Sequence, residues 1–262
     1  MTDMPSIDLR AVRFGYKNAR QKIEALNGVD LSIADGEFVC VIGPSGCGKS
    51  TLLRLLAGLD MPDGGEISIG GQPVEGPGAD RMIVFQDYAL FPWLTAEKNI
   101  SFALNRAKRV PRAEAKRTAA EYLKKVGMAQ AADYYPCQLS GGMKQRVAIA
   151  RALAMDTDIL LLDEPFGALD AKIRASLQEL LLELWTNDGR KKKTVVFVTH
   201  DINEALILAD RIVYMQPGKI AGELRIDIPR PRRNVESGEE FGAYRRTLMR
   251  LFEGEDTEVA EL

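Results

Sequence analysis

One stretch decides the fold of this 262-residue chain: Gly43-Pro44-Ser45-Gly46-Cys47-Gly48-Lys49-Ser50-Thr51. An apolar run, Phe38–Ile42, precedes it, and a leucine-rich pattern that predicts a helix over residues 51–59 follows it. The order of strand, glycine loop and helix, with Gly, four residues and then Gly-Lys-Ser, fits a phosphate-binding loop. We therefore expect this stretch to bind a nucleotide.

Each part of the loop has a chemical reason. Its glycines let backbone N–H groups approach phosphate oxygens, and the open N-terminus of the following helix adds unpaired donors and a partial positive charge. Lys49 supplies a full charge, and the Ser50 hydroxyl can ligate Mg²⁺. Cys47 lies where added bulk would collide with the nucleotide, so bound nucleotide should shield an accessible thiol. A glycine turn that matches by chance is the alternative, and it explains neither flanking element.

Composition limits the partners. The chain has 35 Lys and Arg against 37 Asp and Glu, a net charge of −2, so it lacks the basic excess of a nucleic-acid binder. The three cysteines, Cys40, Cys47 and Cys137, are odd in number and form no metal-spaced pair, which indicates a reducing, cytosolic environment. No signal peptide and no apolar run of about 18 residues is recognisable, so a partner would have to cross any membrane that the chain serves.

Hydrophobic periodicity predicts an α/β fold. Ile7–Tyr16, Gly28–Ile33 and residues 64–71 alternate apolar and polar side chains and predict an antiparallel β subdomain beside the nucleotide core. The continuous apolar runs 159–162 and 194–199 predict buried strands of a mainly parallel sheet.

Two further segments differ from this core. The region 87–139 predicts an inserted helical lobe, with helices over 96–104 and 111–126. In the C-terminal extension, 229–262, five apolar or aromatic residues fall on one helical face, and an acidic tail that we expect to be disordered begins at residue 253.

Polar side chains follow three of the predicted core strands. Gln86 follows a predicted strand over residues 82–85, Asp163 and Glu164 follow the strand at 159–162, and His200, the only histidine, follows the strand at 194–199. Because α/β sheets bind ligands at the carboxyl ends of their strands, one nucleotide pocket can collect all of them together with the loop at Gly43. Asp163 is the candidate Mg²⁺ ligand, and Glu164 can polarise a water for attack on the terminal phosphate. The alternatives are acids that only cap a loop and a surface histidine.

Two weaker signals complete the set. Ser140-Gly141-Gly142 starts a predicted helix with a bare first turn, which makes a second potential anion site, although a Ser-Gly-Gly start is more often an ordinary cap. Tyr16 ends a predicted strand, where its ring could stack on a base, although such a tyrosine is more often a surface or core residue.

Taken together, these motifs resemble the nucleotide-binding subunit of an ABC transporter over about residues 7–228, which places an ABC ATPase domain at 1–228. The resemblance implies a P-loop NTPase fold and two ATP molecules between two copies, each bound by the phosphate loop of one chain and the Ser140-Gly141-Gly142 helix start of the other. It further implies that Tyr16 stacks on adenine, Gln86 senses Mg²⁺ and the attacking water, and Glu164 is the catalytic base. By the same resemblance, Asp170 lies at the dimer contact and His200 contacts the terminal phosphate.

Three segments, 84–95, 166–170 and 227–232, are similar to bacterial importers of nitrate, sulfonates and taurine. This resemblance implies permease subunits in the membrane, a periplasmic substrate-binding protein, and a position on the cytoplasmic face of the cell membrane. The apolar loop 88–93 would line the groove that receives a short helix of the permease. The cargo stays open, because the resemblance implies that other subunits choose it.

Two other classes of ATPase or GTPase fit the sequence less well. A soluble ABC ATPase of translation or DNA maintenance usually carries two nucleotide domains or long coiled-coil insertions, and the sequence shows neither. A small-molecule kinase or GTPase would share the phosphate loop, but this class does not explain Ser140-Gly141-Gly142. The sequence also lacks the Asn-Lys-x-Asp motif by which GTPases recognise guanine.

Overall fold

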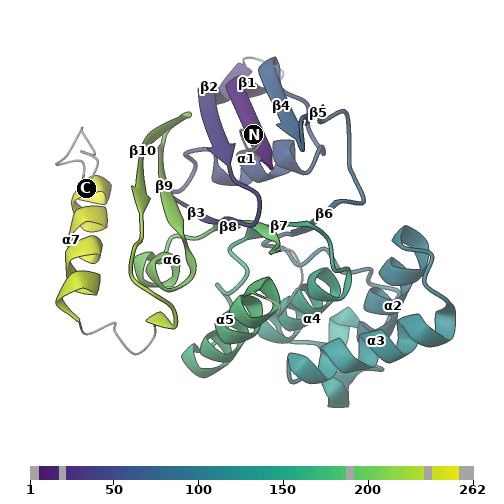
Figure 1. Ribbon diagram of the computed structural model, residues 1–262. Coiled ribbons are helices and arrows are strands. Elements are labelled where there is room, and N and C mark those ends of the chain that lie inside the picture. Colours follow the sequence, from purple (N-terminus) through teal and green to yellow (C-terminus); the bar gives the residue numbers. More distant parts are fainter. Residues whose placement is uncertain (1–5, 18–21, 187–191, 233–237, 254–262) are drawn as a thin grey trace. The chain divides into compact units, whose positions relative to one another are not determined.

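The computed structural model describes residues 6–17, 22–186, 192–232 and 238–253 (Figure 1). The chain forms two compact units. Unit 1 contains Met1–Gly78 and Lys192–Leu262, and unit 2 contains Ala79–Lys191.

Unit 1 contains the predicted antiparallel sheet. Its strands are β1 (Ile7–Lys17), β2 (Lys22–Ile33), β4 (Gly64–Ile69) and β5 (Gln72–Pro73), in the order β2-β1-β4-β5. Ile7 of β1 lies opposite Ile33 of β2 and Ile69 of β4, so the register brings three isoleucines side by side. The strand expected at 28–33 begins earlier, at Lys22, because β1 and β2 pair along their whole length.

The same unit contains four strands around the phosphate loop. β3 (Phe38–Ile42) pairs in parallel with β8 (Thr194–Val198) and β9 (Arg211–Gln216), while β10 (Lys219–Arg225) runs antiparallel to β9. Every residue of β3 and β8 is buried, as the continuous apolar runs predicted. The loop at Gly43 therefore begins at the carboxyl end of a buried parallel strand.

Three helices complete unit 1. α1 (Lys49–Leu56) follows the phosphate loop and α6 (Ile202–Leu208) packs on β3. α7 (Glu239–Glu253), yellow in Figure 1, packs on α6. The predicted apolar face of α7 is confirmed, since Phe241, Leu248 and Leu251 are buried. The acidic residues 254–262 and most of the basic run 189–193 lie outside the described residues.

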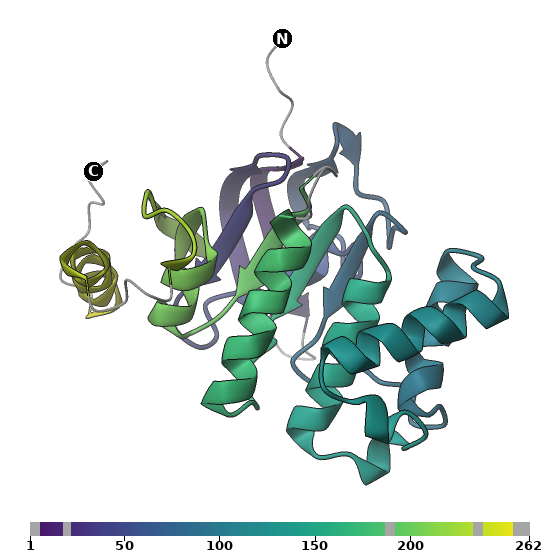
Figure 2. The same ribbon diagram turned by 60° about the horizontal axis from the view of Figure 1, so that its bottom comes forward.

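Unit 2 combines a strand pair with helices. β6 (Arg81–Val84) is parallel to β7 (Ile159–Asp163). The helices are α2 (Ala96–Ala107), α3 (Arg112–Lys125), α4 (Gly141–Ala154) and α5 (Ala171–Thr186), with single 3₁₀ turns η1 (Ala129–Ala131) and η2 (Pro136–Gln138). α2, α3 and α4 contact one another, as the teal ribbons of Figure 2 show. Across the described ranges, no helix has the length and apolar character to cross a membrane.

Candidate functional site

The phosphate loop connects β3 to α1 within unit 1. A Cβ on Gly43 would lie only 2.2 Å from the Met215 carbonyl oxygen, so packing admits no side chain there. Gly46 has a left-handed φ of +79°, and no described atom comes within 4 Å of a Cβ built on it. One glycine therefore lets the loop pack on β9, and the other leaves its backbone open to a ligand.

The start of α1 is suited to an anion. The N-cap residue is Gly48, which has no side chain to bond the first-turn N–H groups, so these donors stay available to a ligand. Lys49 is only 7% exposed, and its Nζ donates to the carbonyl oxygens of Gly43 (2.8 Å) and Pro44 (2.9 Å). The ammonium group is thus held against the loop that is predicted to receive the phosphates.

The Cys47 thiol is not accessible in the way that the labelling expectation required. Its side chain is 1% exposed, and its Sγ lies 3.9 Å from Lys49 Nζ. Burial raises the pKa of the thiol, and the nearby Lys49 charge lowers it only in part. Because the thiol is already covered by protein, its labelling cannot report nucleotide binding as expected.

Two further predicted residues belong to unit 1. The Tyr16 hydroxyl lies 3.1 Å from Thr51 Oγ1, which places the ring beside the first turn of α1 with 45% of the residue exposed. His200 is exposed and comes between β8 and α6. Base stacking by Tyr16 and phosphate contact by His200 stay predictions.

Unit 2 brings together the acids and the glutamine that follow its strands. Gln86 Nε2 lies 3.5 Å from Glu164 Oε2. Asp163 is the last residue of β7 and is 8% exposed, while Glu164 has a φ of +45°. A left-handed backbone costs a non-glycine residue on the order of 1–3 kcal/mol, and such strain concentrates at functional sites.

Gln145 of α4 braces this acid, a role that the sequence did not reveal. Its side chain is 2% exposed and donates from Nε2 to the Glu164 carbonyl at 3.0 Å. Its Oε1 accepts from Ala168 N at 3.1 Å. One side chain therefore ties α4 to both ends of the loop after β7. No sequence signal separates Gln145 from its polar neighbours Lys144 and Arg146.

The predicted second anion site is the start of α4. Ser140 is the N-cap, with its Oγ accepting from Met143 N at 3.3 Å. A Cβ on Gly142 would lie 3.1 Å from the Ala168 carbonyl oxygen, so this glycine lets α4 approach the loop before α5. Asp170 accepts from the N–H groups of Lys172 (3.1 Å) and Ile173 (3.0 Å) and so caps α5. Ser140 and Asp170 thus both act as helix caps. Phosphate binding at the start of α4 and a dimer contact at Asp170 stay predictions.

Comparison with known proteins is consistent with this geometry. The ABC transporter family model matches residues 26–167. A taurine import ATP-binding protein from Chromobacterium violaceum is 48% identical, covering 92% of this chain and 94% of that protein. A dimeric ATP-binding cassette in a post-hydrolysis state, bound to ADP and Pi, superimposes with a TM-score of 0.79 at 39% identity, covering 85% of this chain and all of that one.

This chain belongs to the ABC transporter family. It is an ABC-type ATPase with the P-loop NTPase fold, as predicted. A bicarbonate transport ATP-binding protein from Synechococcus elongatus is 53% identical over 81% of this chain, which spans 32% of that protein's length.

The apolar loop 88–93 of this ABC ATPase is held by buried polar side chains of unit 2. Tyr88 and Ala89 have left-handed φ angles of 68° and 42°, and their carbonyl oxygens accept from Arg151 at 3.3 Å and 2.9 Å. Burial lowers the pKa of Arg151. Asn99, fully buried, accepts from Phe91 N at 2.8 Å and donates to its carbonyl oxygen at 3.2 Å. The loop is therefore a fixed surface.

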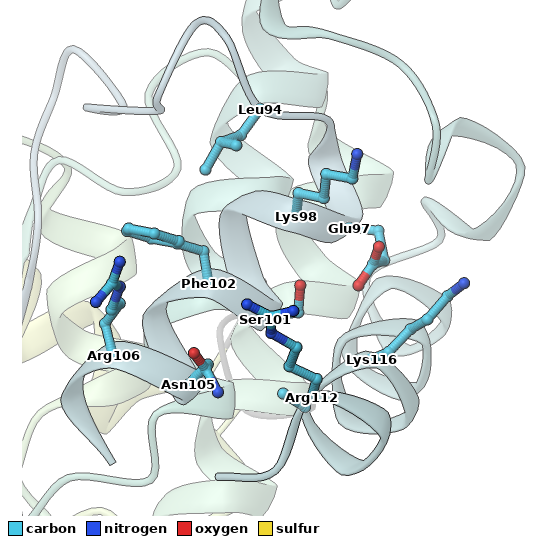
Figure 3. A pocket seen from close by; sticks show the side chains of 10 residues that line it. Leu94, Glu97, Lys98, Ser101, Phe102, Asn105, Arg106, Arg112 and Lys116 are labelled. Atoms are coloured by element: carbon cyan, nitrogen blue, oxygen red, sulfur yellow. The ribbon is translucent and has the colours of Figure 1, made fainter. Parts of the chain in front are cut away.

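An aromatic cluster and a pocket lie beside this loop. The Phe91 ring is 5.5 Å from both Trp93 and Phe102, and Trp93 is 69% exposed. Phe102 also lines a pocket of about 490 Å³ on α2 and α3 (Figure 3). Four cationic side chains line it: Lys98, Arg106, Arg112 and Lys116. None of the four forms an ion pair with a described residue. We call these residues the aromatic-cationic surface.

A metal ion would have to share its coordination with the nucleotide. In the described part of the chain, no three His, Cys, Asp or Glu side chains cluster as metal ligands. Mg²⁺ usually takes one or two carboxylates and completes its shell with water and substrate phosphates. In unit 2, the buried carboxylate of Asp163 fits that mode as a single protein ligand.

Proposed function

We propose that this ABC ATPase powers a bacterial importer of a small nutrient, as a homodimer that forms on ATP binding and docks on membrane permease subunits. The names of the similar taurine and bicarbonate transport proteins support an importer, and nitrate or a sulfonate is an equally suitable cargo. The observation that carries the ATPase mechanism is Glu164, whose carboxylate lies beside Gln86 and whose strained backbone is held by Gln145.

In this proposal, unit 1 binds the nucleotide. All residues of the loop, Gly43, Pro44, Ser45, Gly46, Cys47, Gly48, Lys49, Ser50 and Thr51, surround the phosphates, with backbone N–H groups and the Lys49 charge as donors. Tyr16 stacks on adenine, which is worth about 1–3 kcal/mol. Ser50, Asp163 and Gln86 would hold Mg²⁺, whose charge would offset that of the phosphate oxygens.

Hydrolysis follows from the acids of unit 2. Gln86 orients a water, Glu164 accepts its proton as the oxygen attacks the γ-phosphorus, and the bond to the β-phosphate oxygen breaks to release ADP and phosphate. His200 contacts the γ-phosphate. Ser140, Gly141 and Gly142 of the second copy close on the same phosphate, and Asp170 lies at the contact between copies. The pocket thus needs two chains.

The aromatic-cationic surface is the proposed permease contact. Exposed aromatic rings fixed on a rigid loop are suited to an apolar helix face. The pocket is lined by four cations and one acid, Glu97, and this positive excess favours acidic side chains on the same helix. A short amphipathic helix of the permease, with carboxylates on one side, matches both features. In this proposal, the subunit lies on the cytoplasmic face of the membrane, and a periplasmic binding protein is an indirect partner.

Two measurements test the proposal. Lys49→Ala should abolish ATP hydrolysis and strongly weaken ATP binding, because it removes the charge nearest the phosphates, whereas Lys219→Ala on exposed β10 should leave both unchanged. Near-normal turnover by Lys49→Ala would contradict the pocket. Co-purification from membranes should recover a permease. Recovery of an active subunit without one would favour a soluble ABC ATPase that is not tied to transport.

A further inference from the structure

The Arg232 side chain holds the C-terminal end of α6. It is 2% exposed, and its Nη1 donates to the carbonyl oxygens of Leu206 (2.9 Å) and Ala209. Its Nε and Nη2 donate to the carbonyl oxygens of Ile228 (2.6 Å) and Ile226 (3.0 Å). No described carboxylate pairs with it, and burial lowers the pKa of Arg232 to about 10. A buried charge is thus committed to backbone oxygens.

Arg230 acts on the same helix end. Its Nη2 donates to the Leu208 carbonyl oxygen at 2.5 Å, and its Nη1 to Asp210 Oδ1 at 2.5 Å. The last carbonyls of a helix have no intrahelical partner and carry partial negative charge, so two guanidinium groups are well matched to them. The segment after β10 therefore clamps α6 from its C-terminal side.

The opposite end of α6 carries His200. Asp201 caps the helix by accepting from the N–H groups of Asn203 (2.9 Å) and Glu204 (3.2 Å). Thr199, just before His200, donates to Glu204 at 2.6 Å and accepts from Asp201 N at 3.1 Å. α6 has only seven residues, about 10 Å at 1.5 Å per residue, so a shift at one end reaches the other.

We propose that Arg232, assisted by Arg230, is a positioning residue that sets the place of the His200 imidazole through α6. The functional part rests on the proposed contact of His200 with the γ-phosphate. If the clamp is released, α6 tilts on β3, and the imidazole leaves the position in which it meets the phosphate. A misplacement of about 1 Å can cost on the order of 100-fold in rate.

The single histidine makes a direct test possible, because every imidazole NMR signal of the chain comes from His200. Arg232→Met retains the length and apolar stem but removes the donors, and Arg245→Met, on the exposed side of α7, is the matched control. In nucleotide-free protein, Arg232→Met should shift or broaden the imidazole signal. Its kcat should fall about tenfold or more with little change in the KM for ATP. Arg245→Met should change neither, and Arg232→Lys should restore part of both.

A folded Arg232→Met protein with the parental imidazole signal and kcat would overturn the proposal. Should Arg232→Met not fold, Arg230→Met removes the bonds to Leu208 and Asp210 and leaves Arg232 in place. It should still shift the signal, and an unchanged signal there would equally overturn the proposal. His200→Ala separates the proposed catalytic role of His200 from the proposed clamp on α6. If it retains full kcat, the proposed role of His200 fails, while a shifted imidazole in Arg232→Met still supports the clamp.

Discussion

Gln145 offers the sharpest test of how the fold holds the acid. Gln145→Leu has similar volume but removes the bonds to the Glu164 carbonyl and to Ala168 N, both of which are partly buried. Each buried backbone group left without a partner costs about 1–3 kcal/mol. The Glu164 carbonyl still accepts from Gly167 N at 3.2 Å, so only Ala168 N loses its described partner, and the middle of that range is about 2 kcal/mol. At about 2–4 °C per kcal/mol for a chain of this size, the Tm should fall by roughly 4–8 °C.

In Gln145→Leu, the rate of ATP hydrolysis should fall together with the stability. In a second variant, Gln145→Glu, the two losses should differ in extent. Gln145→Glu retains the acceptor for Ala168 N and loses the donor to Glu164, so it faces one carbonyl oxygen with a carboxylate. Because Glu164 is held at a φ of +45°, loss of this brace should let the backbone relax and lower kcat by about tenfold or more.

The assays are thermal unfolding and steady-state phosphate release at saturating ATP. Gln130→Leu is the control, because it removes a single long bond of an exposed glutamine and should stay within about 0.5 kcal/mol of the parent. If Gln145→Leu melts with the control and releases phosphate at the parental rate, Gln145 does not hold Glu164.

Two other predictions concern the surface and the thiols. Trp93→Glu or Phe91→Glu should abolish co-purification with the permease while ATP still binds, because each puts a charge into the aromatic cluster. Met249→Glu, at an exposed apolar residue of α7 in unit 1, is the control. Retained assembly by both loop variants would remove this loop from the interface. Maleimide should label exposed Cys137 quickly and buried Cys47 slowly, with or without Mg-ATP. Fast labelling of Cys47 in a Cys137→Ser protein would show that the loop opens.

Sequence reasoning was reliable where a local pattern carried the information. The runs Phe38–Ile42 and 159–162 became fully buried strands because unbroken apolar sequence is stable only when both faces are covered. The start of α1 was placed two residues late, at Thr51, because the left-handed Gly48 already serves as its N-cap and lets Lys49 begin the helix.

What the sequence could not show depends on contacts between distant segments. Gln145 reaches a loop some 19 residues away, and nothing in its neighbourhood marks it. Arg232 is buried only because α6 and the segment after β10 fold onto each other, whereas arginine in a Pro-Arg-Pro-Arg run would ordinarily be taken as exposed. The direction of the Cys47 side chain likewise follows from loop packing.

The composite site is tested most directly by the mass of Glu164→Gln in solution. Glutamine keeps the shape and reach of the side chain but cannot take the proton of the attacking water, so ATP should bind and persist. Size-exclusion chromatography with light scattering should then show a dimer with ATP and a monomer without it, and little phosphate should be released. Adding Ser140→Arg should abolish that dimer, because it places bulk and charge at the α4 start while leaving the phosphate loop intact. A Glu164→Gln protein that stays monomeric at saturating ATP, or a double variant that dimerises equally well, would contradict the account.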